Sequence, residues 1–165
     1  MTLRLPRLLT TTGAAALAVA GLVAMPGTAS AAAASECSAR QHKEFDTLGV
    51  NLDAYITLCV YRDASNDYKA TAYVSWADGG QGNSGGMEKF YVQVRVERND
   101  TVYRTNTTNY SNVMNSAGSG SGSNSTPEYR SATTGGWTAD GTVTYNIDLD
   151  GEGDKTWQLG GSPSI

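Results

Sequence analysis

The chain has 165 residues, of which 17% are charged, and its formal net charge is −4 at pH 7. This length suits one domain. The acidic balance excludes the electrostatic steering toward nucleic acid or anionic lipid that basic proteins use, so no nucleic-acid partner is expected.

The first 31 residues have the parts of a secretory signal peptide. Arg4 and Arg7 give a positive start, and an apolar run covers residues 14–25. That run is too short to span a bilayer, which takes about 20 apolar residues, and the Ala-Ser-Ala of residues 29–31 is a cleavage signal. The sequence therefore predicts a secreted, extracellular protein with no membrane contact after cleavage. A retained membrane anchor is the alternative.

The chain contains two cysteines, Cys37 and Cys59. In an oxidising compartment an even count of two predicts one intramolecular disulfide, which would stabilise the fold by about 3 kcal/mol. Two free thiols or a metal pair are the alternatives, but the spacing fits no zinc motif. By strand parity, Cys59 falls on the same face of the sheet as several tyrosines. The bridge is therefore expected to tie the N-terminal segment across that face.

Alternation of apolar and polar residues predicts strands along most of the mature chain. Residues 38–48 fit either an edge strand or one helical turn, and Asn99-Asp100 predicts a tight hairpin turn. The predicted strands are residues 51–62, 69–77, 88–98, 101–108, 142–149 and 156–159. Together these segments predict an all-β fold, an antiparallel β-sandwich of about seven strands that is immunoglobulin-like or related. One domain is expected over residues 32–165.

Two segments are expected to be loops. Residues 78–86 are too rich in glycine for a strand, and residues 106–136 form a long stretch of Gly, Ser, Asn and Thr with an SGSGS core at residues 119–123. Loops this long are usually functional or disordered, and the Gly/Ser content favours disorder. Tyr110, Tyr129 and Trp137 at its margins allow part of it to pack.

The first candidate site is the outward face of the central strands. By parity, Tyr55, Tyr61, Tyr73 and Tyr91 fall on the polar side of their strands, and Trp137 lies in a loop nearby. Tyrosine rings on a sheet face can stack on sugars or grip a protein. Ordinary sheet packing is the alternative, because tyrosine is a good strand former.

The second candidate is an acidic turn in which carboxylates alternate with other residues: Asp148, Asp150, Glu152 and Asp154. Alternate carboxylates with glycine at the sixth place resemble the first half of an EF-hand calcium loop. The twelfth position is Leu159 rather than glutamate, and the flanks predict strands. A weak calcium site is therefore one reading, and a charged hairpin that keeps an edge soluble is the other. No other cofactor is expected.

Catalytic motifs are sparse. His42 is the one histidine of the chain, and no nucleophile-elbow motif accompanies it. The sequence therefore favours a non-enzymatic extracellular binding module for a cell-wall polysaccharide or an extracellular protein. A secreted hydrolase or a hydrolase inhibitor is the alternative.

Overall fold

The computed structural model describes residues 32–80 and 85–165. The signal peptide predicted for residues 1–31 lies outside the described residues, as does the middle of the predicted loop at 78–86. Within the described ranges, no helix has the length and apolar character that a membrane crossing requires.

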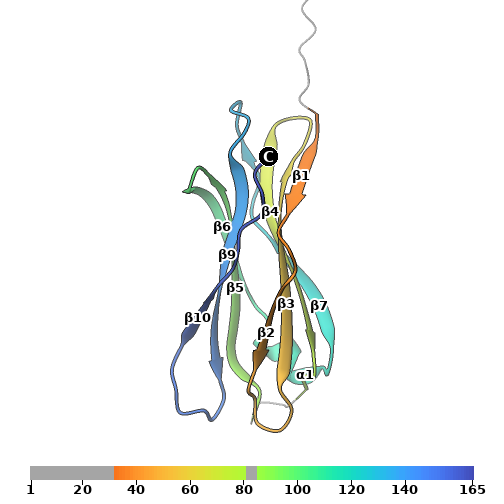
Figure 1. Cartoon of the computed structure of the whole chain (residues 1–165), viewed down its shortest axis with the longest axis vertical. Helices are drawn as coiled ribbons and strands as arrows, with labels where there is room; N and C mark the ends of the chain where they lie inside the picture. The colour runs from red at the N-terminus through yellow and green to blue at the C-terminus, as the bar shows by residue number, and fades with distance from the viewer. Residues whose placement is uncertain (1–31, 81–84) are drawn as a thin grey trace, which may run out of the picture.

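Two antiparallel sheets pack face to face, which confirms the predicted all-β sandwich (Figure 1). The strands of sheet A are β1 (Ala34–Cys37), β2 (Gln41–Phe45), β3 (Leu52–Arg62), β4 (Asp67–Ala77), β7 (Gly120–Ser125) and β8 (Tyr129–Arg130). Those of sheet B, in spatial order, are β10 (Lys155–Gln158), β9 (Trp137–Ile147), β5 (Met87–Arg98) and β6 (Thr101–Asn109). The described residues thus form ten strands rather than about seven.

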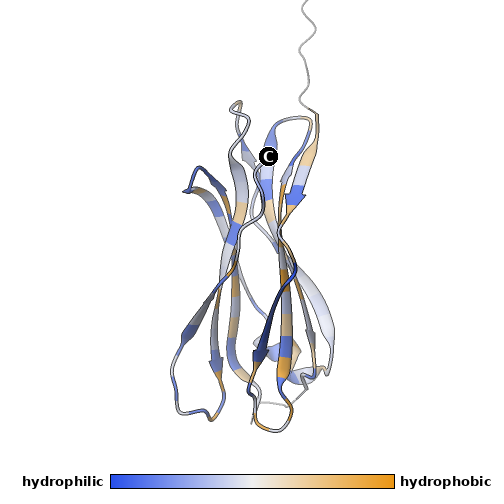
Figure 2. Ribbon diagram, in the orientation of Figure 1, coloured by the Kyte–Doolittle hydropathy of each residue, from blue (hydrophilic) through white to orange (hydrophobic). Residues whose placement is uncertain are grey.

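The predicted alternation places one side of each long strand in the core. On β3, for example, Leu52, Ala54 and Ile56 are buried while the residues between them are partly exposed. Hydrophobic and hydrophilic bands accordingly alternate along the ribbons (Figure 2). Because successive side chains of a strand point to opposite faces, each sheet buries one face and presents the other to solvent.

The predicted hairpin turn between β5 and β6 is confirmed. Asn99 and Asp100 have φ angles of 48° and 63°, the left-handed conformation that two-residue hairpin turns need. The strands then pair in antiparallel register, with a bulge between Val96 and Glu97.

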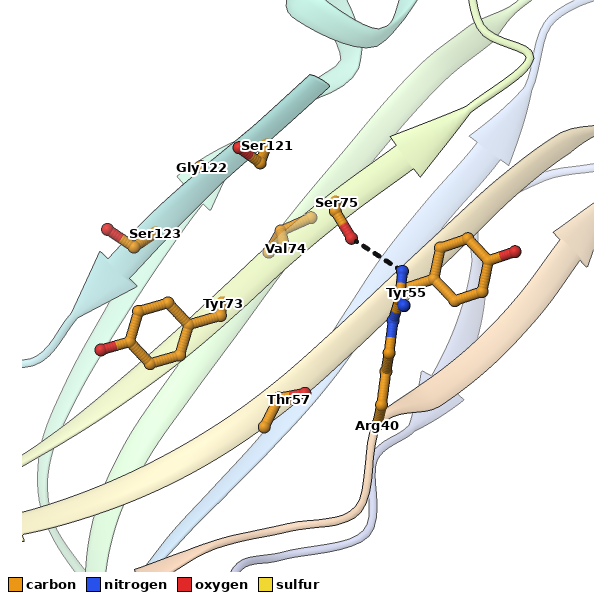
Figure 3. Close-up of a pocket in the computed structure, with 9 residues that line it drawn as sticks. All are labelled: Arg40, Tyr55, Thr57, Tyr73, Val74, Ser75, Ser121, Gly122 and Ser123. Carbon is orange, nitrogen blue, oxygen red and sulfur yellow. Dashed lines mark hydrogen bonds between the residues drawn. The ribbon is translucent and has the colours of Figure 1, made fainter. Parts of the chain in front are cut away.

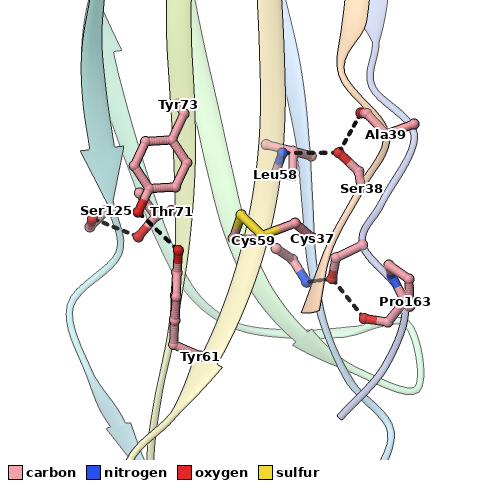
Figure 4. Close-up of a disulfide and its surroundings, with 12 residues drawn as sticks. Cys37, Ser38, Ala39, Leu58, Cys59, Tyr61, Thr71, Tyr73, Ser125 and Pro163 are labelled. Atoms are coloured by element: carbon pink, nitrogen blue, oxygen red, sulfur yellow. Dashed lines mark hydrogen bonds between the residues drawn. A yellow bond between two sulfur atoms is a disulfide. The ribbon is translucent and has the colours of Figure 1, made fainter. Parts of the chain in front are cut away.

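The ambiguous segment 38–48 contains a strand, since β2 pairs with the first half of β3. β1 pairs with the second half of β3, and the Cys37–Cys59 disulfide joins directly opposed residues (Figure 4). The predicted disulfide is confirmed, and Cys59 lies on the same side of β3 as Tyr55 and Tyr61, as its strand parity predicted. The segment was expected to lie across that face, but its backbone runs beside β3 at the sheet edge, and only the side chains of Arg40 and His42 reach over Tyr55.

The expectation that residues 106–136 form a loop is also wrong for much of the segment. It contains the end of β6, a short helix α1 (Ser111–Ser116), β7 and β8. In β7 the glycines face the core, where a Cβ on Gly120 would lie 2.3 Å from the Trp76 ring and one on Gly122 would lie 2.8 Å from Tyr110. The Gly/Ser alternation is therefore a strand pattern whose buried positions must be small because large rings occupy the space above them.

Candidate functional site

Three of the five predicted aromatic site residues share one surface. Tyr55 and Tyr61 on β3 and Tyr73 on β4 project from the outer face of sheet A, the side away from the core. Tyr91 belongs to β5 and therefore to sheet B, where it is 38% exposed. Trp137 is 1% exposed, stacks on Tyr68 and donates its indole N–H to Thr133, so it is a core residue rather than a surface ligand-binding residue.

Strand register places the outer residues of β3, β4 and β7 in two neighbouring rows. One row runs from Tyr55 to Ser75 to Ser121. The next runs from Thr57 to Tyr73 to Ser123. Aromatic rings and hydroxyl groups therefore alternate over a small area of the sheet.

These rows line a groove with a volume of about 420 Å³ on the outer face of sheet A (Figure 3). We call it the tyrosine groove. Its lining combines two tyrosine rings, polar side chains, Val74 and Gly122 and contains no acidic residue: Arg40, Tyr55, Thr57, Tyr73, Val74, Ser75, Ser121, Gly122 and Ser123. Tyr73 is 46% exposed and offers the open ring in this groove.

Tyr55 contacts two other side chains. The His42 ring stacks on it with centroids 4.6 Å apart, and the Arg40 guanidinium carbon lies 4.0 Å from the same centroid. The His42 ring and the Arg40 guanidinium therefore both pack against the Tyr55 ring. His42 is itself fixed by a 2.5 Å hydrogen bond between its Nε2 and Asp53. Tyr55 therefore positions Arg40 instead of offering a platform of its own.

Hydroxyl groups next to the groove form further contacts (Figure 4). The Tyr61 and Tyr73 hydroxyls lie 2.9 Å apart, and those of Thr71 and Ser125 lie 2.8 Å apart. Burial, together with the hydrogen bond and the charge interaction with Tyr73, raises the pKa of Tyr61 to about 12. The bond to Tyr61 also restrains the Tyr73 ring.

The acidic turn connects β9 to β10, and its carboxylates contact lysines. Lys155 pairs with Asp150 and Glu152, and Lys89 pairs with Asp154. Nowhere in residues 32–80 and 85–165 do three or more His, Cys, Asp or Glu side chains form a group suited to holding a metal ion. The calcium site at Asp148, Asp150, Glu152 and Asp154 stays a prediction, and these contacts fit the charged hairpin.

His42 does not form a catalytic triad in the part of the chain that the structure describes. Its ring hydrogen-bonds to the Asp53 carboxylate and not to a serine or threonine hydroxyl. The hydrogen bond to Asp53 thus orients the His42 ring at the edge of the sheet, but no described nucleophile is bonded to that ring as a catalytic triad would require.

Comparison with protein-family models, with curated proteins and with solved structures gave no match to this chain. The site must be interpreted from its own geometry. Sequence reasoning missed the hydroxyl residues of β7, because residues 119–123 looked disordered. It also missed Arg40, whose contact with Tyr55 is a tertiary property. The strict Gly/Ser alternation in that stretch was the signal that could have identified it as a strand.

Proposed function

We propose that the protein is an exported, non-enzymatic module that binds a glycan chain in the tyrosine groove. The observation that carries this proposal is the pairing of an open ring, Tyr73, with a floor of hydroxyl groups from Thr57, Ser75, Ser121 and Ser123. A sugar has an apolar face that can stack on an aromatic ring and hydroxyls that exchange hydrogen bonds with serine and threonine.

Affinity binding to insoluble and soluble polysaccharides tests this function, with the protein purified from the medium of an expressing strain. Tyr73→Ala should weaken binding about tenfold or more, a loss of about 1.4 kcal/mol. Tyr91→Ala is the matched control, because this exposed tyrosine lies on the other sheet. Equal binding by wild type and Tyr73→Ala would remove the groove from consideration.

Export is part of the same proposal. A disulfide is typical of oxidising compartments, and the Cys37–Cys59 bond is compatible with an extracellular location. Mass spectrometry of protein from the medium should give an N-terminus close to Ala32. Retention of the full chain in the membrane fraction would contradict export with cleavage of the signal peptide.

The alternative of a secreted hydrolase or hydrolase inhibitor stays a prediction without a specific observation in its favour. Assays for glycan and peptide cleavage on the same samples, run for activity and for inhibition, test it directly.

A further inference from the structure

One positively charged side chain, Arg40, lines the tyrosine groove. We infer that the glycan bound there carries carboxylate groups, as uronic acid sugars do, and that Arg40 binds one of these carboxylates. This inference rests on the proposed glycan-binding function and specifies its ligand class.

The Arg40 guanidinium is free of internal charge partners. None of the ion pairs among the described residues includes it, and all 16 acidic residues of the chain lie within the described ranges. Its one hydrogen bond, to the Ser75 hydroxyl, is long at 3.4 Å. Most of its five N–H donors therefore remain available for a ligand.

The guanidinium is also held in place before any ligand arrives. It stacks on Tyr55, which also stacks on the His42 ring, and His42 is in turn fixed by Asp53. An arginine ordered in this way loses less rotamer entropy on binding than a free surface side chain. Its planar fork matches a carboxylate, which can accept two parallel hydrogen bonds.

The spacing in the groove suits a sugar that carries its charge on the ring. Arg40 reaches Ser75, and Tyr73 is two residues away on the same face of β4 (Figure 3). Two residues of a strand span about 6.8 Å. A pyranose ring stacked on Tyr73 can therefore extend a carboxylate substituent toward Arg40. The hydroxyl floor favours a sugar over the C-terminal carboxylate of a peptide.

Paired probes test the inference: oligogalacturonate, oligomannuronate and hyaluronan oligosaccharides, each beside its own carboxyl-reduced form. The full exported protein should bind at least one uronate probe about tenfold more tightly than its reduced counterpart. Arg40→Gln should abolish this preference, so that the uronate probe and its reduced form bind the variant equally. Arg40→Lys should keep part of the preference, and Arg104→Gln is the control at an exposed arginine on sheet B.

The outcomes separate this inference from the proposed function. Equal binding of a uronate probe and its reduced form, or an unchanged preference in Arg40→Gln, overturns the carboxylate assignment and leaves glycan binding standing. Tighter binding of dextran sulfate than of every uronate probe also overturns it. Failure of all glycans, neutral ones included, overturns both.

Discussion

The outer faces of sheets A and B both carry charged and aromatic side chains and both contain ion pairs, but one arginine on each face is held in a different way. On sheet B, Arg95 bonds to Glu97 at 2.6 Å and to Asp140 at 3.2 Å, and Lys89 pairs with Asp154. On the sheet A face, Arg40 stacks on Tyr55, and no described carboxylate pairs with it. Charges satisfied within a face stabilise the fold, whereas a charge held in place without a counter-ion is available to a ligand.

The sheets also differ in how their edges are secured. Each edge of sheet A is divided between two short strands, β1 with β2 and β7 with β8. The edges of sheet B are formed by β10 and the nine-residue β6. Short edge strands resist edge-to-edge aggregation but contribute few ladder hydrogen bonds. The sheet that carries the groove therefore depends more on the interactions that fasten its edges.

Replacing Cys37 and Cys59 together by serine tests that dependence and should have the largest effect on stability. The disulfide closes a 22-residue separation, and its removal should lower the free energy of unfolding by about 3 kcal/mol. Urea denaturation measures the loss, and hydrogen exchange should show amides of β1 and β3 losing protection before those of β5 and β9. Reduced wild-type protein is the control. Uniform loss of protection in both sheets would contradict the expected difference.

Removing one charge from each face sharpens the comparison. Glu97 is 6% exposed and accepts a hydrogen bond from Arg95. Glu97→Gln should cost about 2 kcal/mol of stability, since hydrogen bonds to charged groups contribute about that much. Arg40→Gln should change stability by less than about 0.5 kcal/mol, as expected for an exposed side chain without an ion pair.

Urea denaturation at low ionic strength measures both variants. A larger loss for Arg40→Gln than for Glu97→Gln would mean that Arg40 is a structural residue. In that case its stacking on Tyr55, and not ligand binding, would explain its position.

The long strands were predictable because their burial is one-sided. In β3, β4, β5 and β9 a period of two is sustained over many residues, and a local window detects it. The outward parity of Tyr55, Tyr61 and Tyr73 followed from the same pattern. Which sheet each strand joins is a tertiary property, so the sequence could not separate Tyr91 from the others.

β7 and Trp137 show where a local pattern fails. Glycine and serine have low strand propensity, and β7 forms because its glycines admit the rings of Trp76 and Tyr110. Those rings come from β4 and from the residue before α1, distant in sequence. Trp137 looked like a loop residue but begins β9 and packs against Tyr68 and Tyr103. Both outcomes depend on long-range packing that no single segment encodes.

Gly120→Ala tests this account of β7 and should have a smaller effect than removal of the disulfide or of the Glu97 charge. The new Cβ would meet the Trp76 ring, so the strand or the ring must move. Overpacking of this kind should cost between about 1 and 2 kcal/mol. Ser121→Ala, one position along on the outward side, should cost less than about 0.5 kcal/mol. Equal effects of the two changes would contradict the inward placement of Gly120.

The smallest expected effect is the pH dependence that Tyr61 adds on the sheet A face. The pKa of Tyr61 is raised from 10.0 to about 12, mainly by burial and further by Tyr73. A raised folded-state pKa means that the native protein holds this proton more tightly than the unfolded chain does. The resulting stability is fully present below about pH 10 and is lost as the pH rises toward 12.

Thermal melting of the wild type should therefore show a fall in the melting midpoint between pH 9 and pH 12. The fall should be smaller in Tyr61→Phe, which has no phenol to ionise at this position. Tyr73→Phe should retain most of the fall, because burial is the largest cause of the raised pKa and the Tyr73 hydroxyl contributes less. Tyr91→Phe, on sheet B, should behave as the wild type does. If Tyr61→Phe melted with the same pH profile as the wild type, the phenol of Tyr61 would be exposed to water, and the restraint it places on Tyr73 in the groove would be absent.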